Sequence, residues 1–147
     1  MSCREYFYDK IGAIEAIPDN CINFHKPFNM EKKGMMPSFS ITGDKKKNVP
    51  MKKKSGVIKE SVNTSVAGDS YEISLKWEIE KITEETYVIL DGLKNEINHL
   101  IIRTFSDEGY FIRSVYPGYS FEYYESDGMI TCELSITSTT GLQRLSD

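Results

Sequence analysis

Residues 71–80 read Tyr-Glu-Ile-Ser-Leu-Lys-Trp-Glu-Ile-Glu, and this stretch decides the fold. Its apolar residues alternate with charged or polar ones. Because successive side chains of a β-strand point to opposite faces of a sheet, the alternation predicts a strand with one buried and one wet face. At about 3.3 Å per residue the strand spans about 33 Å, so we expect it to form the backbone of a sheet. The residues of the buried face are Tyr71, Ile73, Leu75, Trp77 and Ile79.

The spacing of the apolar residues changes after residue 80. Thr83 is a candidate N-cap, and the Glu84 and Glu85 that follow it suit the positive end of a helix dipole. The pattern predicts one amphipathic helix over Thr83–Asn98, with His99 at its C-terminus, although Gly92 is an unfavourable interior residue. The apolar stripe, at steps of three and four, consists of Thr86, Leu90, Leu93, Ile97 and Leu100.

Four short strands are expected after the helix, at residues 100–105, 110–115, 119–124 and 129–137. Asp127-Gly128 predicts a tight hairpin between the last two, because both residues tolerate the positive φ of a type I′ turn. The simplest interpretation is four antiparallel strands in sequence. In the last strand, Cys132 shares a face with Ile130, Leu134 and Ile136, which indicates a core position.

The aromatic residues of this block favour packing over base stacking. Alternation places Tyr119, Phe121 and Tyr123 on one face and Tyr124 on the other. Cross-strand aromatic pairs are an ordinary source of sheet stability, and outward tyrosines suit a protein interface.

The first half of the chain is punctuated by prolines. Residues 5–11 and 21–24 are candidate strands, and residues 37–42 and 55–63 look like two arms flanking a lysine-rich stretch, Gly43–Lys54. We expect one β-rich domain over 1–147, with an irregular segment (1–36), a lysine-tipped hairpin (37–63) and the strand-helix-strand block (70–145). The predicted fold class is α+β, mainly β: an antiparallel β-sandwich or barrel flanked by a single α-helix.

Composition excludes several classes of protein. An apolar content of 39% with 12% aromatic residues is enough to build a core. No apolar run approaches the roughly 18 residues of a membrane helix, and the charged N-terminus lacks a signal-peptide core, so we expect a cytosolic start and no membrane contact. The three cysteines, Cys3, Cys21 and Cys132, include no close-spaced pair, which argues against a disulfide framework or a zinc site.

Charge is unevenly distributed along the chain. Residues 31–54 hold eight lysines and two acidic residues, a net charge of +6, whereas the whole chain carries −4. Three interpretations remain open: a solvated loop, a polyanion-binding loop, and a basic arm that contacts the acidic body of a neighbouring copy. The third implies head-to-tail association, which closes into rings or continues into tubes. Its candidate contact residues are Lys45, Lys46, Lys47, Lys52, Lys53 and Lys54.

Catalytic patterns find little support. Neither histidine needs a catalytic role: His25 lies in a turn, and His99 at a helix C-terminus suits the dipole. Glu84 and Glu85 are adjacent helix residues that point in different directions. No phosphate loop, dinucleotide fingerprint or metal-ligand spacing is present, so we expect no enzyme activity, no cofactor and no metal.

The long strand, the single helix and the returning strands that end in Ile136-Thr137-Ser138-Thr139-Thr140-Gly141-Leu142 resemble the tail-tube and distal-tail ring proteins of long-tailed bacteriophages and contractile injection systems. The resemblance covers about half of the chain. It implies a β-sandwich or barrel with one flanking helix, hexameric rings joined edge to edge, and a long loop, here Gly43–Lys54, that contacts the next ring. The implied partners are further copies and adjacent tail proteins, with nucleic acid only as passing DNA. The implied location is the virion tail, assembled in the host bacterial cytoplasm; the alternative function is a small domain that binds nucleic acid or another polyanion.

Overall fold

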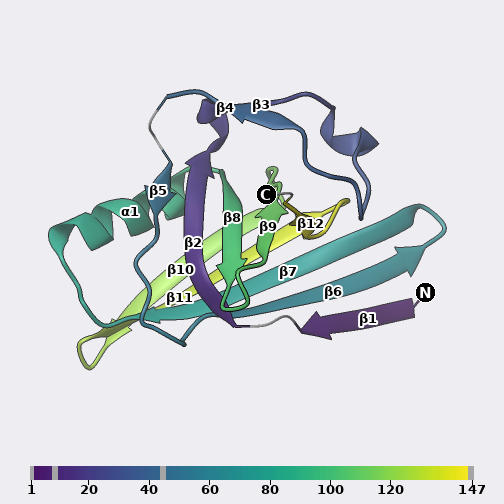
Figure 1. The fold of residues 1–147 in the computed structure, drawn as a ribbon. Coiled ribbons are helices and arrows are strands. Elements are labelled where there is room, and N and C mark those ends of the chain that lie inside the picture. The colour runs from purple at the N-terminus through teal and green to yellow at the C-terminus, as the bar shows by residue number, and fades with distance from the viewer. Residues whose placement is uncertain (1, 8–9, 44–45, 146–147) are drawn as a thin grey trace.

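The computed structural model describes residues 2–7, 10–43 and 46–145 (Figure 1). These described residues include one α-helix, α1 (Glu84–Asn95), and two single turns of 3-10 helix, η1 (Asp19–Cys21) and η2 (Phe28–Met30). The strands in chain order are β1 (Ser2–Phe7), β2 (Ile11–Pro18), β3 (Ile22–Phe24), β4 (Phe39–Ile41), β5 (Lys47–Asn48), β6 (Val57–Ser65), β7 (Gly68–Ile79), β8 (Asn98–Thr104), β9 (Gly109–Ile112), β10 (Tyr119–Ser126), β11 (Met129–Ser138) and β12 (Gln143–Arg144).

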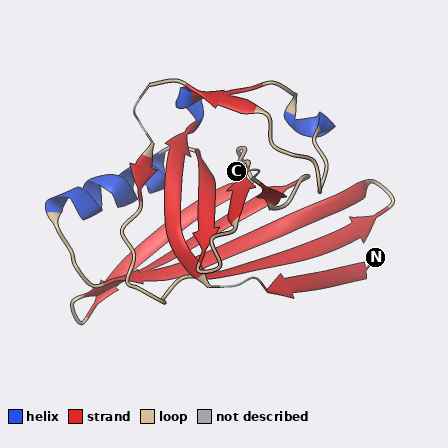
Figure 2. Ribbon diagram, viewed as in Figure 1, coloured by secondary structure: helices blue, strands red, loops and turns tan. Residues whose placement is uncertain are grey.

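Two five-stranded antiparallel sheets form the body of the molecule (Figure 2). Sheet A has the order β1-β6-β7-β11-β10, and sheet B has the order β12-β9-β8-β2-β5. One hydrophobic cluster joins both sheets and the helix, with Trp77 from sheet A, Leu100 from sheet B and Leu90 from α1 among its members. The predicted fold class, a mainly β protein with antiparallel sheets and one flanking helix, is confirmed.

The alternation at residues 71–80 becomes the central strand β7. Its apolar side chains, from Tyr71 to Ile79, are all buried, whereas Glu72, Ser74 and Lys76 are exposed. The strand starts three residues before the predicted stretch, at Gly68. Cys132, on the neighbouring β11, pairs with Trp77 and is fully buried, which confirms its predicted core position.

Helix α1 starts as predicted but ends three residues early. Thr83 and Thr86 form a reciprocal capping box at its start, and Leu90 and Leu93 face the core. Asn98 was predicted to be helical, but it begins β8. Its side-chain amide donates to the carbonyl oxygens of Gly92, which also accepts the backbone N–H of Glu96, and of Glu96 itself at the helix end. The stripe prediction is therefore wrong beyond Leu93.

His99 is consequently a strand residue, and its predicted place at a helix C-terminus is wrong. The physical reason is that the apolar run at residues 100–102 fills the interior of sheet B. Strand β8 pairs there with β2 on one side and β9 on the other.

The strands that follow the helix are present, but they are divided between the two sheets. The hairpin β8–β9 belongs to sheet B and the hairpin β10–β11 to sheet A, so the four strands do not form one consecutive sheet. The chain crosses between the sheets at residues 113–118. The Asp127-Gly128 turn is confirmed, with φ values of +54° and +76°.

The first half of the chain contributes to both sheets. The candidate strand at 21–24 is present as β3, and the one at 5–11 is replaced by β1 and β2. Strands β3 and β4 form a separate two-stranded sheet that lies over sheet B through a second apolar cluster, which includes Ile17, Ile101 and Phe111. We call residues 22–41, which contain β3, η2 and β4, the flap (Figure 2, top).

The predicted hairpin of residues 37–63 does not form. Strand β4 pairs with β3, whereas β6 pairs with β1 and β7, so the two arms are not partners. The stretch between them lies along the body, because β5 pairs with β2 and Val49 is buried in the core. The described part of the predicted basic tip is thus a strap along the β2 edge of sheet B (Figure 1).

Candidate functional site

Five of the six lysines predicted to contact a partner are described by the structure, and these five lie in two groups. Lys45 lies outside the described residues. Lys46 forms an ion pair with Glu15 of β2, with 2.7 Å between Nζ and Oε2, and Lys47 lies in β5. The body of the protein therefore already neutralises Lys46.

Lys52, Lys53 and Lys54 form the second group, in a turn beside the end of β7. The backbone N–H of Lys52 donates to the carbonyl oxygen of Glu78 (2.6 Å), which holds the turn in place, and Lys53 and Lys54 are exposed. Lys52 and Lys53 line an open cavity of about 380 Å³ together with Lys81 and Glu80. Lys81 was not predicted from the sequence as a site residue, because only the fold brings it beside Lys52.

A hairpin overhang extends from the far end of sheet A. Strand β11 pairs with β7 no further than Tyr71, opposite Ser138, but β6 and β7 continue pairing to Ser65 and Gly68. We call residues 63–70 the overhang. On the side away from β6, no described strand pairs with its Gly68–Ser70 edge. The overhang is the right-hand tip in Figure 1, opposite the end that carries the β10–β11 turn.

The tip of the overhang is apolar. Its two turn residues are Val66 and Ala67, and Val66 is completely exposed at 109% of its reference area. Two-residue hairpin turns normally favour asparagine, aspartate or glycine. Here the positive φ falls on Gly68 (+116°), so the turn needs no particular residue type at positions 66 and 67. The turn geometry therefore does not explain why these two residues are apolar.

A groove of about 410 Å³ opens at the base of the overhang. Phe28, Val115 and Pro117 supply apolar surface, and Ser70, Thr137 and Thr139 supply hydroxyl groups. We call it the end groove. The close approach of two chain segments shapes it, because a Cβ at Gly118 would lie 2.7 Å from the carbonyl oxygen of Thr137.

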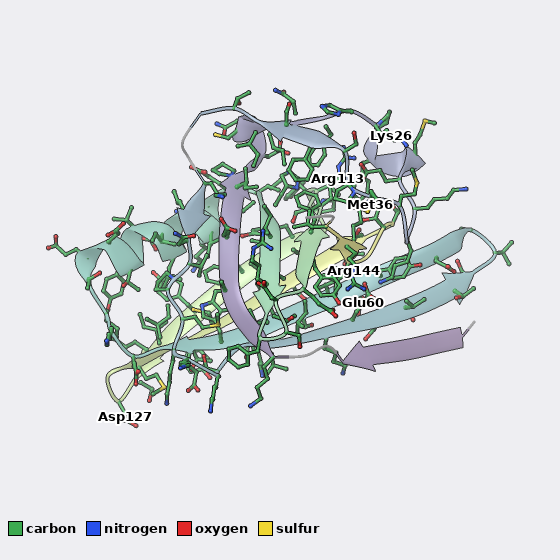
Figure 3. All side chains as sticks on the ribbon, viewed as in Figure 1. Lys26, Met36, Glu60, Arg113, Asp127 and Arg144 are labelled. Atoms are coloured by element: carbon green, nitrogen blue, oxygen red, sulfur yellow. The ribbon has the colours of Figure 1, made fainter. Side chains whose placement is uncertain are left out.

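Phe28 of the flap forms one wall of the end groove, and a buried ion pair positions this wall. Arg113 Nη1 lies 2.9 Å from Glu31 Oε1 and donates to the carbonyl oxygen of Lys26 at 2.9 Å. The guanidinium lies 3.7 Å from the ring centre of Phe24 and 5.4 Å from that of Phe28. These contacts hold Phe28 against the body (Figure 3 labels Arg113 and Lys26).

His99 lies in the same region. Together with Asp19 and Ser114 it forms a set of residue types that resembles a catalytic triad. Its Nε2 is 2.7 Å from Asp19 Oδ1, and its Nδ1 accepts a hydrogen bond from the backbone N–H of Ser114. Since Nδ1 is an acceptor, the neutral ring carries its proton on Nε2. Burial lowers the pKa of His99, which favours this neutral form, although Asp19 opposes the effect.

This geometry does not activate the Ser114 hydroxyl. A nucleophilic serine needs a hydrogen bond from its oxygen to the base, but Nδ1 is occupied by the backbone and Ser114 Oγ is buried without a hydrogen-bond partner. The arrangement fastens η1 to β8 and to the segment that follows β9, and is structural.

Cys132 and His25 are not arranged as a reactive centre. Burial raises the pKa of the Cys132 thiol to about 12, so the reactive thiolate is suppressed. His25 is exposed and pairs with Ser38. Across the described ranges, no cluster of three or more histidine, cysteine, aspartate or glutamate residues is arranged to hold a metal, and no helix combines the length and apolarity needed to cross a bilayer.

Comparisons of the chain with protein-family models, with curated proteins and with solved structures found no match. The overhang, the end groove and the turn that holds Lys52, Lys53 and Lys54, which we call the lysine turn, are therefore the features from which a function can be argued.

Proposed function

We propose that the protein is a non-enzymatic structural subunit of a phage tail or tail-like assembly, in which copies associate into a ring, hexameric in the simplest case, or a tube. It would assemble in the bacterial cytoplasm and function in the virion tail beside other tail proteins. The architecture that motivates this proposal is a sandwich with a single flanking helix.

The observation that carries the proposal is the overhang. Residues 64–69 are exposed, and the completely exposed Val66 packs on nothing in its own subunit. A projecting strand pair with an apolar tip and an unpaired edge is a surface for association with another chain.

The two edges of sheet A differ in a way that favours directional assembly. Helix α1 covers β10, where the hydroxyl groups of Tyr119 and Tyr123 donate to the Leu93 carbonyl oxygen (2.6 Å) and to Asp91 Oδ1 (2.7 Å). Strand β1 forms the opposite edge, and no described strand pairs with its outer side. The two edges of sheet A therefore present different surfaces to a neighbouring copy.

Light scattering coupled to size-exclusion chromatography over a wide concentration range tests the proposal, followed by negative-stain microscopy. We expect concentration-dependent association and rings or short tubes. A strictly monomeric protein at high concentration, without rings or tubes alone or with its neighbouring proteins, would contradict it.

A second candidate function is polyanion binding at the lysine turn. Lys52, Lys53 and Lys81 converge on one open cavity, with Glu80 as the opposing charge. Phosphate contacts by lysine weaken steeply with salt. Retention on immobilised DNA or heparin should fall with salt and disappear in the K52Q/K53Q/K81Q variant. Retention that is unaffected by these substitutions would remove the reason for this candidate.

A further inference from the structure

The end groove and the overhang tip have complementary chemistry on one molecule. The groove has apolar walls from Phe28, Val115 and Pro117, and the tip presents Val66 and Ala67 to solvent. An apolar tip in water and an open apolar groove both lose unfavourable hydration when they meet.

The groove also offers backbone hydrogen bonds to an extended chain. Ser70 lines it and belongs to the unpaired Gly68–Ser70 edge of β7, at the point where β11 has left that strand. A segment that enters the groove can therefore meet backbone groups of this edge, which no described strand pairs with on the side away from β6.

The tip of a subunit cannot fill the groove of the same subunit. Val66 lies four residues from Ser70, about 13 Å along an extended strand. The β6–β7 pairing extends to Ser65 and Gly68, immediately beside the turn, so the tip cannot fold back. The matching occupant is the same tip on another copy.

We infer that the end groove is the docking site for the Val66-Ala67 tip of a second copy of this chain. This inference rests on the proposed assembly function and specifies its contact. Each copy supplies one tip and one groove, so a heterologous contact of this kind builds a ring or continues as a tube.

Substitutions at the two surfaces test the inference by sedimentation velocity. Val66→Asp places a charge on the tip, and Thr139→Arg obstructs the groove from an exposed position. The matched control is Val88→Asp, because Val88 is also an exposed valine (64%) but lies on α1. We expect at least tenfold weaker association for V66D and T139R and wild-type association for V88D.

Mixing two chains that each carry one accessible cysteine gives a direct readout of the contact. In a C3S background, in which Cys21 and Cys132 are buried, a V66C chain is mixed with a T139C chain under mild oxidation. We expect a disulfide-linked heterodimer, and no such product from V88C mixed with T139C.

The outcomes separate this inference from the proposed function. If wild-type protein assembles and V66D assembles equally well, or if the V66C–T139C crosslink fails to form, the docking inference is wrong and the assembly function stands. If wild-type protein remains monomeric throughout, the proposed function fails as well. Circular dichroism and thermal melting of each variant confirm that it is folded.

Discussion

Glu60 and Lys33 form an ion pair between the inner face of β6 and the flap, with 2.5 Å between Oε1 and Nζ. The Glu60 side chain is fully buried and also accepts the backbone N–H of Leu142 (2.7 Å), whereas Lys33 is 35% exposed. Three segments distant in the sequence therefore meet at one carboxylate, which lies beside the C-terminal segment (Figure 3).

The two halves of this pair should differ in their effect on stability. Lys33→Met removes this cation from the buried carboxylate and should lower the free energy of unfolding by about 3 kcal/mol. Glu60→Gln retains an acceptor for Leu142 and leaves a lysine that can reach water, so we expect a smaller loss of about 1–2 kcal/mol. Urea unfolding measures both. Equal losses, or a larger loss for E60Q, would contradict this account.

Asn98 should stabilise the end of α1. Asn98→Ala removes the side-chain donor to the Glu96 carbonyl oxygen and the second donor to Gly92, whose carbonyl oxygen keeps the backbone N–H of Glu96, so we expect a loss of about 1–2 kcal/mol in urea unfolding. The matched control is Asn95→Ala at the exposed last helical position, where we expect a change within about 0.5 kcal/mol. Similar losses at both positions would show that Asn98 has no special role at the helix end.

His99 should make the folded state sensitive to acid. Burial lowers the pKa of folded His99 from its ordinary value of 6.5, while Asp19 raises it and Arg113 lowers it by smaller amounts. The unfolded chain therefore binds the proton more readily, and stability falls as the pH drops below about 6.5. We expect the stability advantage of wild type over H99Q to shrink between pH 7.5 and pH 5.5. The control H25Q, at an exposed site, should keep the wild-type pH dependence; an unchanged difference between wild type and H99Q would contradict the prediction.

Cys132 should be unreactive in the native protein. Its thiol is fully buried and has a pKa raised to about 12, so a thiol reagent at pH 8 meets neither an accessible sulfur nor a thiolate. In a C3S background we expect labelling of Cys21 and Cys132 only after denaturation. Rapid labelling of the native C3S protein would show that the core opens far more readily than this packing implies.

The elements that the sequence predicted well are those specified by local spacing. The alternation at residues 71–80, the Thr83 cap and the Asp127-Gly128 turn depend on neighbouring residues, and all three are present. The C-terminus of the helix was predicted wrongly, because the apolar residues that follow it fit both a helical stripe and a buried strand. The strand formed instead of a longer helix, because these residues pair on both sides as β8, the central strand of sheet B.

The features of the candidate site divide in the same way, into those visible in the sequence and those that depend on the fold. The lysines were visible in the sequence, but whether they project or lie flat depended on the pairing of β5 with β2 and on the burial of Val49. The apolar turn at Val66 was also present in the sequence, but only the early end of β11 shows that this turn projects beyond the sheet.

The sequence by itself determined the class of fold, the central strand, the core position of Cys132 and the separation of charge, because side-chain periodicity and composition are local properties. Only the tertiary structure decided which strands share a sheet, where His99 lies, and that a groove opens beside the overhang. Those features depend on contacts between residues far apart in the chain, such as Phe28 with Val115 and Thr139 around one groove, and no local pattern encodes such contacts.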